Sequence, residues 1–203
     1  MECGDYFIEF DKTGFPLIRK KEWDYFISLF PVSKYQFERF MIELGPQKGL
    51  YTDEWYGEIL KLNPRSSWKK ITVEPWKLFL TGVTKEEIFY FLEYLGKDFS
   101  LPTVSQWRNL FYNSDKIVYS LKRKRFSFSK MAPPARFWIK NGFFPLVKEG
   151  LLEMVIEGDK QYCIGKPWQE LLPNLWRADE VKEVNWEVAR RAVGFRVVKK
   201  LKL

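Results

Sequence analysis

The stretch that most constrains the fold of this 203-residue chain runs from Gly82 to Phe111. Thr84 followed by Glu87 has the spacing of a capping box, in which a hydroxyl and a carboxylate each bind a backbone N–H group at the start of a helix. Apolar residues then recur at helical spacing until Gly96, a residue type that commonly ends helices. The sequence therefore predicts a helix between Thr84 and Gly96.

A second helix is predicted after a stiff corner formed by Leu101, Pro102 and Thr103. Thr103 is a candidate N-cap, and an apolar face would begin with Trp107 and continue through residues 110 and 111. We expect two short helices joined by this corner.

The first 45 residues carry signals for strands and then for a helix. Aromatic and aliphatic side chains alternate with polar ones on both sides of Gly14 and Pro16, which predicts a pair of strands around a turn. Ser33 then has the position of an N-cap, with Phe37 on the apolar face of a helix that Gly45 would end.

Composition indicates one folded domain over residues 1–203. Hydrophobic residues make up 46% of the chain and aromatic residues 18%, which is enough for a sizeable core. No apolar run approaches the roughly 20 residues of a membrane-spanning helix, and the first residues lack the basic start and apolar core of a secretory signal. We therefore expect a cytoplasmic protein that does not enter a membrane.

Several classes of chemistry are disfavoured by residue content. Histidine is absent, which removes the commonest general base and the commonest transition-metal ligand. Cys3 and Cys163 lie too far apart in this kind of chain to indicate a disulfide framework, and a metal site with so few soft ligands is not expected. Cys163, between Tyr162 and Ile164, has the surroundings of a small core side chain rather than a nucleophile. We expect no cofactor and no enzymatic activity.

Four segments match, in order, the motifs of one known family. Residues 100–107 read SLPTVSQW, against Arg-Leu-Pro-Thr-Glu-x-Glu-Trp. Residues 31–40, PVSKYQFERF, are a relaxed copy of Glu-Val-Thr-x-x-x-Tyr-x-x-Phe, with Ser33 in place of the Thr and Phe37 in place of the Tyr. Residues 148–154, KEGLLEM, correspond to Gly-Leu-Tyr-Asp-Met, and residues 190–198, RRAVGFRVV, correspond to an ending in Gly-Phe-Arg-Val. The chain thus resembles the formylglycine-generating (sulfatase-modifying) domain family.

This resemblance implies an α+β fold of the C-type-lectin-like class, with short helices around a small twisted antiparallel sheet and much irregular structure. The chain would end in a final strand of the central sheet, with Phe195 and Val197 on one face and Arg196 on the other. Gly194 would allow a turn or a close backbone approach. The family's Asn and Trp-Glu-Trp after the third motif are replaced here, so a calcium site is not carried over.

The resemblance also implies that the family's chemistry has been lost. Members that oxidise cysteine to formylglycine hold copper with two cysteines near the C-terminal end, and residues 176–196 contain none. The sulfoxide-synthase branch requires three histidine ligands to iron, which this chain lacks. A non-catalytic relative is therefore expected, and a diverged oxidase that uses Cys163 is an alternative.

Recognition is the remaining use of such a fold. The resemblance implies a rigid core that presents an irregular surface before the last strand, where we predict that a protein partner binds, since Trp and Arg often anchor interfaces. A ligand-binding variable protein of a diversity-generating retroelement, another branch of the family, is a further alternative. The predicted ligand-binding residues are Lys166, Trp176, Arg177, Asn185, Trp186, Arg190 and Arg191.

Nucleic acid is the alternative partner, because the chain has a net charge of +8. A basic run is flanked by Tyr119 and Phe126, and such interleaving can bind phosphates while it stacks bases. The run could equally be a solvated hairpin tip with Phe126 and Phe128 facing the core. Its residues are Lys122, Arg123, Lys124 and Arg125.

Overall fold

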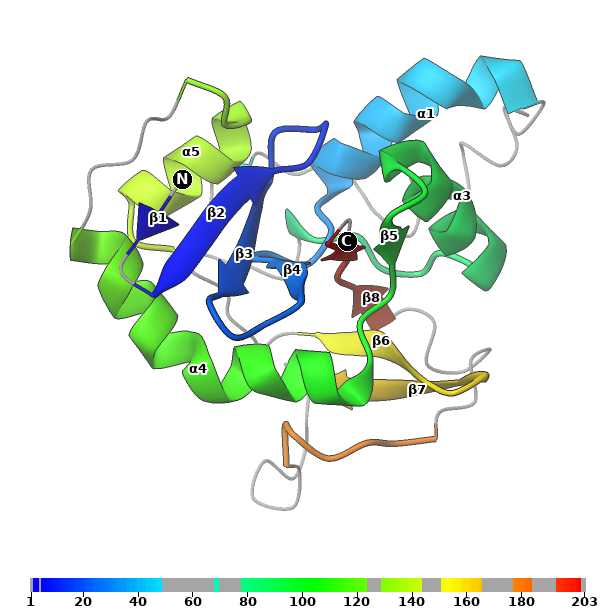
Figure 1. Ribbon diagram of the computed structural model, residues 1–203. Coiled ribbons are helices and arrows are strands. Elements are labelled where there is room, and N and C mark those ends of the chain that lie inside the picture. Colours follow the sequence, from blue (N-terminus) through cyan, green and yellow to red (C-terminus); the bar gives the residue numbers. More distant parts are fainter. Residues whose placement is uncertain are drawn as a thin grey trace.

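The computed structural model describes residues 2–3, 5–48, 68–69, 78–123, 129–143, 151–165, 177–183 and 193–201. These residues form a mixed α+β fold, the class that the resemblance implied, but with two sheets and one parallel strand pair instead of a single small antiparallel sheet (Figure 1). The helices are α1 (Lys34–Lys48), α3 (Lys85–Leu95), α4 (Val104–Arg123) and α5 (Pro133–Lys140). The strands are β1 (Glu2–Cys3), β2 (Tyr6–Phe10), β3 (Pro16–Lys20), β4 (Tyr25–Ser28), β5 (Phe99–Ser100), β6 (Leu152–Glu157), β7 (Lys160–Gly165), β8 (Val193–Phe195) and β9 (Val198–Lys200).

The larger sheet joins the two ends of the chain. Its strand order is β1-β2-β3-β4-β9-β5, and every pairing in it is antiparallel. Four strands, rather than the predicted two, come from the first 30 residues. A tight turn in which the Trp23 N–H binds the Lys20 carbonyl separates β3 from β4, and it carries neither glycine nor proline.

The smaller sheet has the order β7-β6-β8, with β8 parallel to β6. The chain passes from this sheet to the larger one between β8 and β9, so the predicted single final strand is wrong. The close backbone approach expected at Gly194 is present, since a Cβ atom there would lie 2.8 Å from the Leu80 carbonyl oxygen. The chain therefore crosses between the sheets next to a position, Gly194, where the backbone lies too close to that of Leu80 for a side chain to fit.

The predicted capping box at α3 is formed, and α4, for which only the N-cap Thr103 was predicted, begins with a second capping box. The Thr84 hydroxyl accepts from the Glu87 N–H at 3.2 Å, and the Glu87 carboxylate accepts from the Thr84 N–H. At α4 the Thr103 hydroxyl accepts from the Gln106 N–H at 3.2 Å, while the Gln106 side-chain oxygen accepts from the Thr103 N–H at 2.9 Å. Gln106 thus supplies the cap although it replaces the acidic residue of the family motif.

Two helices differ from their predicted extent, and a third was not predicted. α4 runs to Arg123 and is not short, and α1 continues past Gly45 to Lys48. The third helix, α5, begins with Pro133 and Pro134, which fit there because the first turn of a helix needs no backbone N–H donor.

The core lies where the helices cover the sheets. Ile18 and Ile27 of the larger sheet share a hydrophobic cluster with Trp107 of α4 and Trp138 of α5. A second cluster contains Phe91 of α3, whose ring lies 5.8 Å from that of Phe37 in α1 and 5.8 Å from that of Phe195. Among the described residues, no helix is both long and apolar enough to span a membrane.

An ion pair is buried at the crossing between the sheets. Arg196 Nε donates to Glu153 Oε2 at 2.7 Å, and the two side chains are 0% and 3% exposed. Arg196 Nη1 also donates to the carbonyl oxygens of Ser28 and Leu29, at 3.2 and 2.8 Å, and Trp107 Nε1 donates to the same Glu153 oxygen. Arg196 thus lies between β8 and β9 rather than on one face of a final strand, and its side chain is fully buried.

The segments that carry the four family motifs bind one another here. The Val32 N–H donates to the Phe195 carbonyl at 2.8 Å, which joins the first motif to the last. The hydrogen-bonded cluster around the ion pair contains one residue from each of the segments 100–107, 148–154 and 190–198. These residues are Trp107, Glu153 and Arg196.

We predict that Glu153→Gln strongly destabilises the fold, because it leaves the Arg196 charge buried without its counter-ion. Breaking a buried pair in this way costs about 3–5 kcal/mol of unfolding free energy. Glu180→Gln is the matched control, since Glu180 meets Lys182 at 3.6 Å on the surface, where a pair contributes about 0–1 kcal/mol. Denaturant unfolding measures both, and equal losses would contradict the central role of the ion pair.

Candidate functional site

Residues 177–183 form an ordered segment against the open edge of the smaller sheet. The backbones of Cys163 and Lys182 exchange two hydrogen bonds, of 3.0 and 2.8 Å, and the Gly165 N–H donates to the Ala178 carbonyl at 3.0 Å. Residues 177–183 therefore lie beside β7 and add a short irregular piece of chain to that edge of the sheet. The only described part of the predicted recognition surface is therefore held by main-chain bonds rather than loosely attached.

Asp179 fixes the same segment to α4. Its carboxylate accepts from the Tyr112 hydroxyl at 2.8 Å, and its carbonyl oxygen accepts from Arg108 Nε at 3.0 Å. Arg177 Nη2 lies 3.4 Å from the same carboxylate oxygen. An arginine and a tyrosine are thus brought side by side, with the Arg177 side chain 77% exposed and Tyr112 62% exposed.

The electrostatics of this cluster follow from these contacts. The hydrogen bond from Tyr112 holds the pKa of Asp179 below its ordinary value of 3.8, because it stabilises the carboxylate. The same bond raises the pKa of the Tyr112 phenol, since ionised Tyr112 would face a negative charge. At neutral pH the cluster therefore holds an ionised carboxylate between a neutral phenol and a guanidinium.

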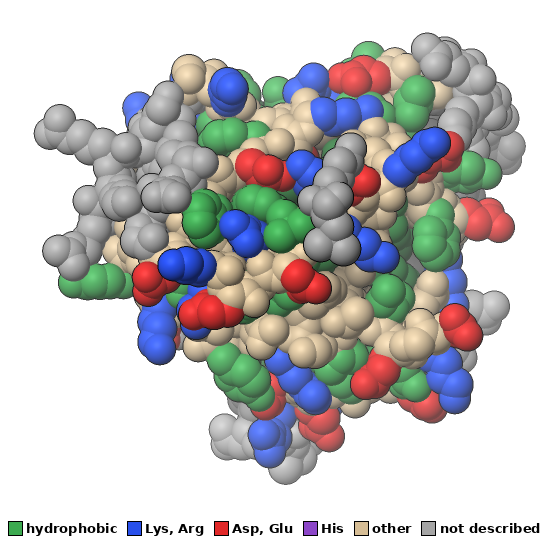
Figure 2. Space-filling model, viewed as in Figure 1, with side chains coloured by type: hydrophobic (Ala, Val, Ile, Leu, Met, Phe, Trp, Pro, Cys, Tyr) green, Lys and Arg blue, Asp and Glu red, His purple; other side chains and the backbone are tan. Residues whose placement is uncertain are grey.

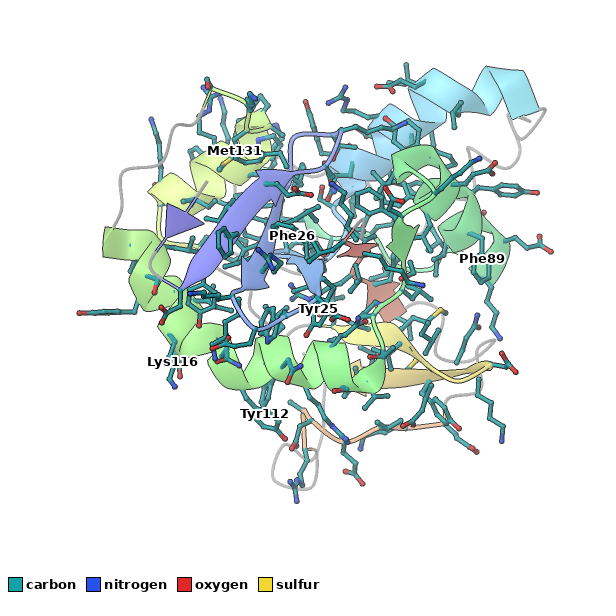
Figure 3. All side chains as sticks on the ribbon, viewed as in Figure 1. Tyr25, Phe26, Phe89, Tyr112, Lys116 and Met131 are labelled. Atoms are coloured by element: carbon teal, nitrogen blue, oxygen red, sulfur yellow. The ribbon has the colours of Figure 1, made fainter. Side chains whose placement is uncertain are left out.

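The outer face of α4 continues this surface. Exposed side chains recur at Tyr112, Lys116, Tyr119 and Lys122, opposite the buried face that contains Trp107. Figure 3 shows Tyr112 and Lys116 on the outer side of α4, with Tyr112 beside residues 177–183, whose Asp179 it binds. We call this outer face of α4, together with Arg108, Asp115 and residues 177–183, the candidate surface.

The candidate surface carries both signs of charge. Its described basic residues are Arg108, Lys116, Lys122, Arg177 and Lys182, and its described acidic residues are Asp115, Asp179, Glu180 and Glu183. Figure 2 shows the same interspersion of basic and acidic side chains over the face that it presents. No single-sign track follows α4 within the part of the chain that the structure describes.

The structure describes only a minority of the predicted site residues. Of the seven predicted ligand-binding residues it describes Arg177 alone, and of the basic run it describes Lys122 and Arg123. These two are helical, so a hairpin tip is wrong for this end of the run. The predicted residues outside the described ones are Lys166, Trp176, Asn185, Trp186, Arg190, Arg191, Lys124 and Arg125, together with Phe126 and Phe128 of the hairpin alternative.

Sequence reasoning missed Tyr112, Lys116 and Asp179. The signal for the first two was the recurrence of polar and aromatic residues at helical spacing beyond Phe111, where the apolar face was followed no further. Asp179 carried no local signal, because its partner Tyr112 is 67 residues away in the sequence.

Cys163 is a core side chain, as predicted. It is 3% exposed, and burial raises the pKa of its thiol to about 12. The group is therefore a neutral thiol at physiological pH, whereas a nucleophilic cysteine is a thiolate. Among the described residues, no group of three Cys, Asp or Glu side chains is arranged to hold a metal ion.

Comparisons of the sequence with known proteins identify no family for this chain. The sequence matches no known protein family, and it matches no curated protein. The resemblance described above therefore depends on the four motifs alone.

We predict that Asp179→Asn weakens the attachment of residues 177–183 in a pH-dependent way. The folded-state pKa of Asp179 is lowered, so its stabilisation is present above its ordinary value of 3.8 and disappears as pH falls through the folded-state value. The difference in melting temperature between wild type and variant should therefore be present at neutral pH and should shrink as the pH is lowered below 3.8. Glu183→Gln, on the same segment, is the control, and a difference independent of pH would contradict the assignment.

We predict that Cys163 reacts with a thiol reagent only when the protein unfolds, because its thiol is buried and protonated. In a Cys3→Ser variant, a chromogenic disulfide reagent should give no signal from the native protein and one equivalent in denaturant. Rapid labelling of the native variant would show an accessible thiolate and would revive the alternative of a diverged oxidase.

Proposed function

We propose that this protein is a non-catalytic recognition module that binds a protein partner through the candidate surface. The observation that carries the proposal is that Arg177 and Tyr112 share one oxygen of Asp179 while both remain largely exposed. Arginine and tyrosine are the residue types most enriched among side chains that dominate binding energy. Here they are adjacent and held in place before any partner arrives.

This pre-organisation is what a recognition surface needs. Ordering a long side chain on binding costs about 0.5–1.5 kcal/mol each. Main-chain bonds to β7 and side-chain bonds to α4 already restrict residues 177–183 in the free protein. Tyr119, two turns further along α4 and 62% exposed, extends the same surface.

The mixed charge favours a protein over nucleic acid. A phosphate backbone is uniformly negative, and Asp115, Asp179 and Glu180 would lie against it. A protein can place complementary charges opposite both signs. Nucleic acid is the second candidate, favoured by Lys116 and Lys122, which flank Tyr119 on the exposed face of α4 beside the predicted basic run.

We further propose that the chain is a formylglycine-generating-enzyme-like domain of C-type-lectin-like fold that works in the cytoplasm without catalysis. Support comes from the interlocking of the four motif segments around Glu153 and Arg196, since residues that hold a shared core together are those a family would keep. The buried thiol of Cys163 weighs against the diverged oxidase. The retroelement alternative depends mainly on residues outside those described.

We predict that a Tyr119→Ala, Arg177→Ala double variant loses its partner. Quantitative mass spectrometry of nuclease-treated pull-downs from the native host would identify proteins retained by wild type but not by this variant. Binding of the purified partner should then weaken at least about tenfold, as expected when anchoring side chains are truncated.

Phe89→Ala is the matched control, because Phe89 is 55% exposed on α3 and outside the candidate surface. Equal retention by the double variant would contradict the proposal. Capture that nuclease abolishes, or affinity that falls log-linearly with salt concentration, would instead favour nucleic acid.

A further inference from the structure

Two arginines of the candidate surface use only part of their hydrogen-bonding capacity. Arg108 Nε donates to the Asp179 carbonyl oxygen at 3.0 Å, and Arg177 Nη2 donates to the Asp179 carboxylate at 3.4 Å. A guanidinium carries several further N–H donors in one plane. Within the described part of the chain, neither arginine makes a second hydrogen bond. Both guanidiniums are therefore held in place and still have donors to offer.

Both guanidiniums lie close to the Tyr112 phenol. Arg108 and Tyr112 are one helical turn apart and share a face of α4, while Tyr112 and Arg177 bind the same oxygen of Asp179. The hydrogen bond to Asp179 raises the pKa of the phenol, and the positive charges of the two arginines oppose this rise. Segments far apart in the sequence thus bring two guanidiniums to one exposed aromatic ring.

The charges of the candidate surface do not balance. It has one more basic residue than acidic residues among those that the structure describes. The two arginines share the single carboxylate of Asp179, whereas the neighbouring Glu180 lies 3.6 Å from Lys182, which offsets its charge. The excess positive charge therefore lies at the arginine pair, where one additional carboxylate would neutralise it.

We propose that the protein partner presents an aspartate or glutamate side chain to this surface, and that Arg108 and Arg177 bind its carboxylate. Parallel N–H donors of a guanidinium match the two oxygens of a carboxylate, and the exposed Tyr112 ring can cover the methylene groups of the incoming side chain. A single carboxylate fits the local excess of charge, whereas a run of phosphates would also meet Asp115 and Glu180. This inference rests on the proposed function, because it presupposes a protein partner at the candidate surface.

The test uses a phage-displayed library of random peptides, selected on the immobilised full chain. Selected peptides are synthesised, and their affinities for wild type and Tyr119→Ala identify those that bind at the candidate surface. Each such peptide is compared with a counterpart in which every Asp and Glu is replaced by Asn and Gln. A single-stranded DNA oligonucleotide is the second probe, because phosphates also bind arginine.

We expect the peptides that require Tyr119 to contain Asp or Glu, and their neutral counterparts to bind at least about tenfold more weakly, as the loss of a charge-assisted pair predicts. Arg177→Gln should weaken the acidic peptides by a similar factor. Arg177→Lys should restore only part of the affinity, because an ammonium cannot form two parallel hydrogen bonds with a carboxylate.

Lys97→Gln is the matched control, since it removes an exposed positive charge outside the candidate surface. It should leave the affinity for the acidic peptides unchanged. Arg108→Gln should act like Arg177→Gln, and its melting temperature shows whether residues 177–183 remain attached. Because Arg177 is the more exposed of the two arginines, its variants decide the outcome if Arg108→Gln is destabilised.

Equal affinities of the acidic and neutral peptides would overturn the inference, as would equal losses in Lys97→Gln and Arg177→Gln or tighter binding of the oligonucleotide. Peptides that require Tyr119 but contain neither Asp nor Glu would overturn the carboxylate and leave the protein partner in place. A library that yields no peptide dependent on Tyr119 would contradict both proposals.

Discussion

The buried ion pair between Arg196 and Glu153 fixes the relative positions of the main parts of this fold. Removing two charges from water costs several kcal/mol per ion, and the cost is offset only where the remaining donors and acceptors are satisfied. Arg196 meets this condition with Glu153 and two carbonyl groups from the end of β4, and Glu153 also accepts from Trp107. The geometry requires both sheets, α4 and the crossing chain to be in place together.

A second buried carboxylate, that of Asp11, also joins separate elements of the fold. Asp11 accepts from the N–H groups of Thr13 and Phe15, at 2.8 and 3.0 Å, and from the Gln36 side chain at 3.0 Å. Burial raises its pKa and these hydrogen bonds oppose the rise. Because Gln36 also caps the start of α1 through Ser33, the β2–β3 hairpin and α1 are oriented by one polar cluster.

The candidate surface places exposed aromatic and charged side chains on a support that restricts their motion. The support is the main-chain pairing of residues 177–183 to β7 together with Asp179, which binds both Tyr112 and Arg177.

The sequence by itself determined the features that arise within a few residues: the capping box of α3, the start of each long helix, the buried thiol of Cys163 and the close approach at Gly194. It could not place the turn before β4, because backbone bonding there uses no special residue. The pairs that define the core and the sites join residues 43 positions apart for Arg196 and Glu153, and 67 apart for Tyr112 and Asp179. Only the tertiary structure decided them, since such contacts depend on how the sheets and helices pack and leave no periodic signal in the chain.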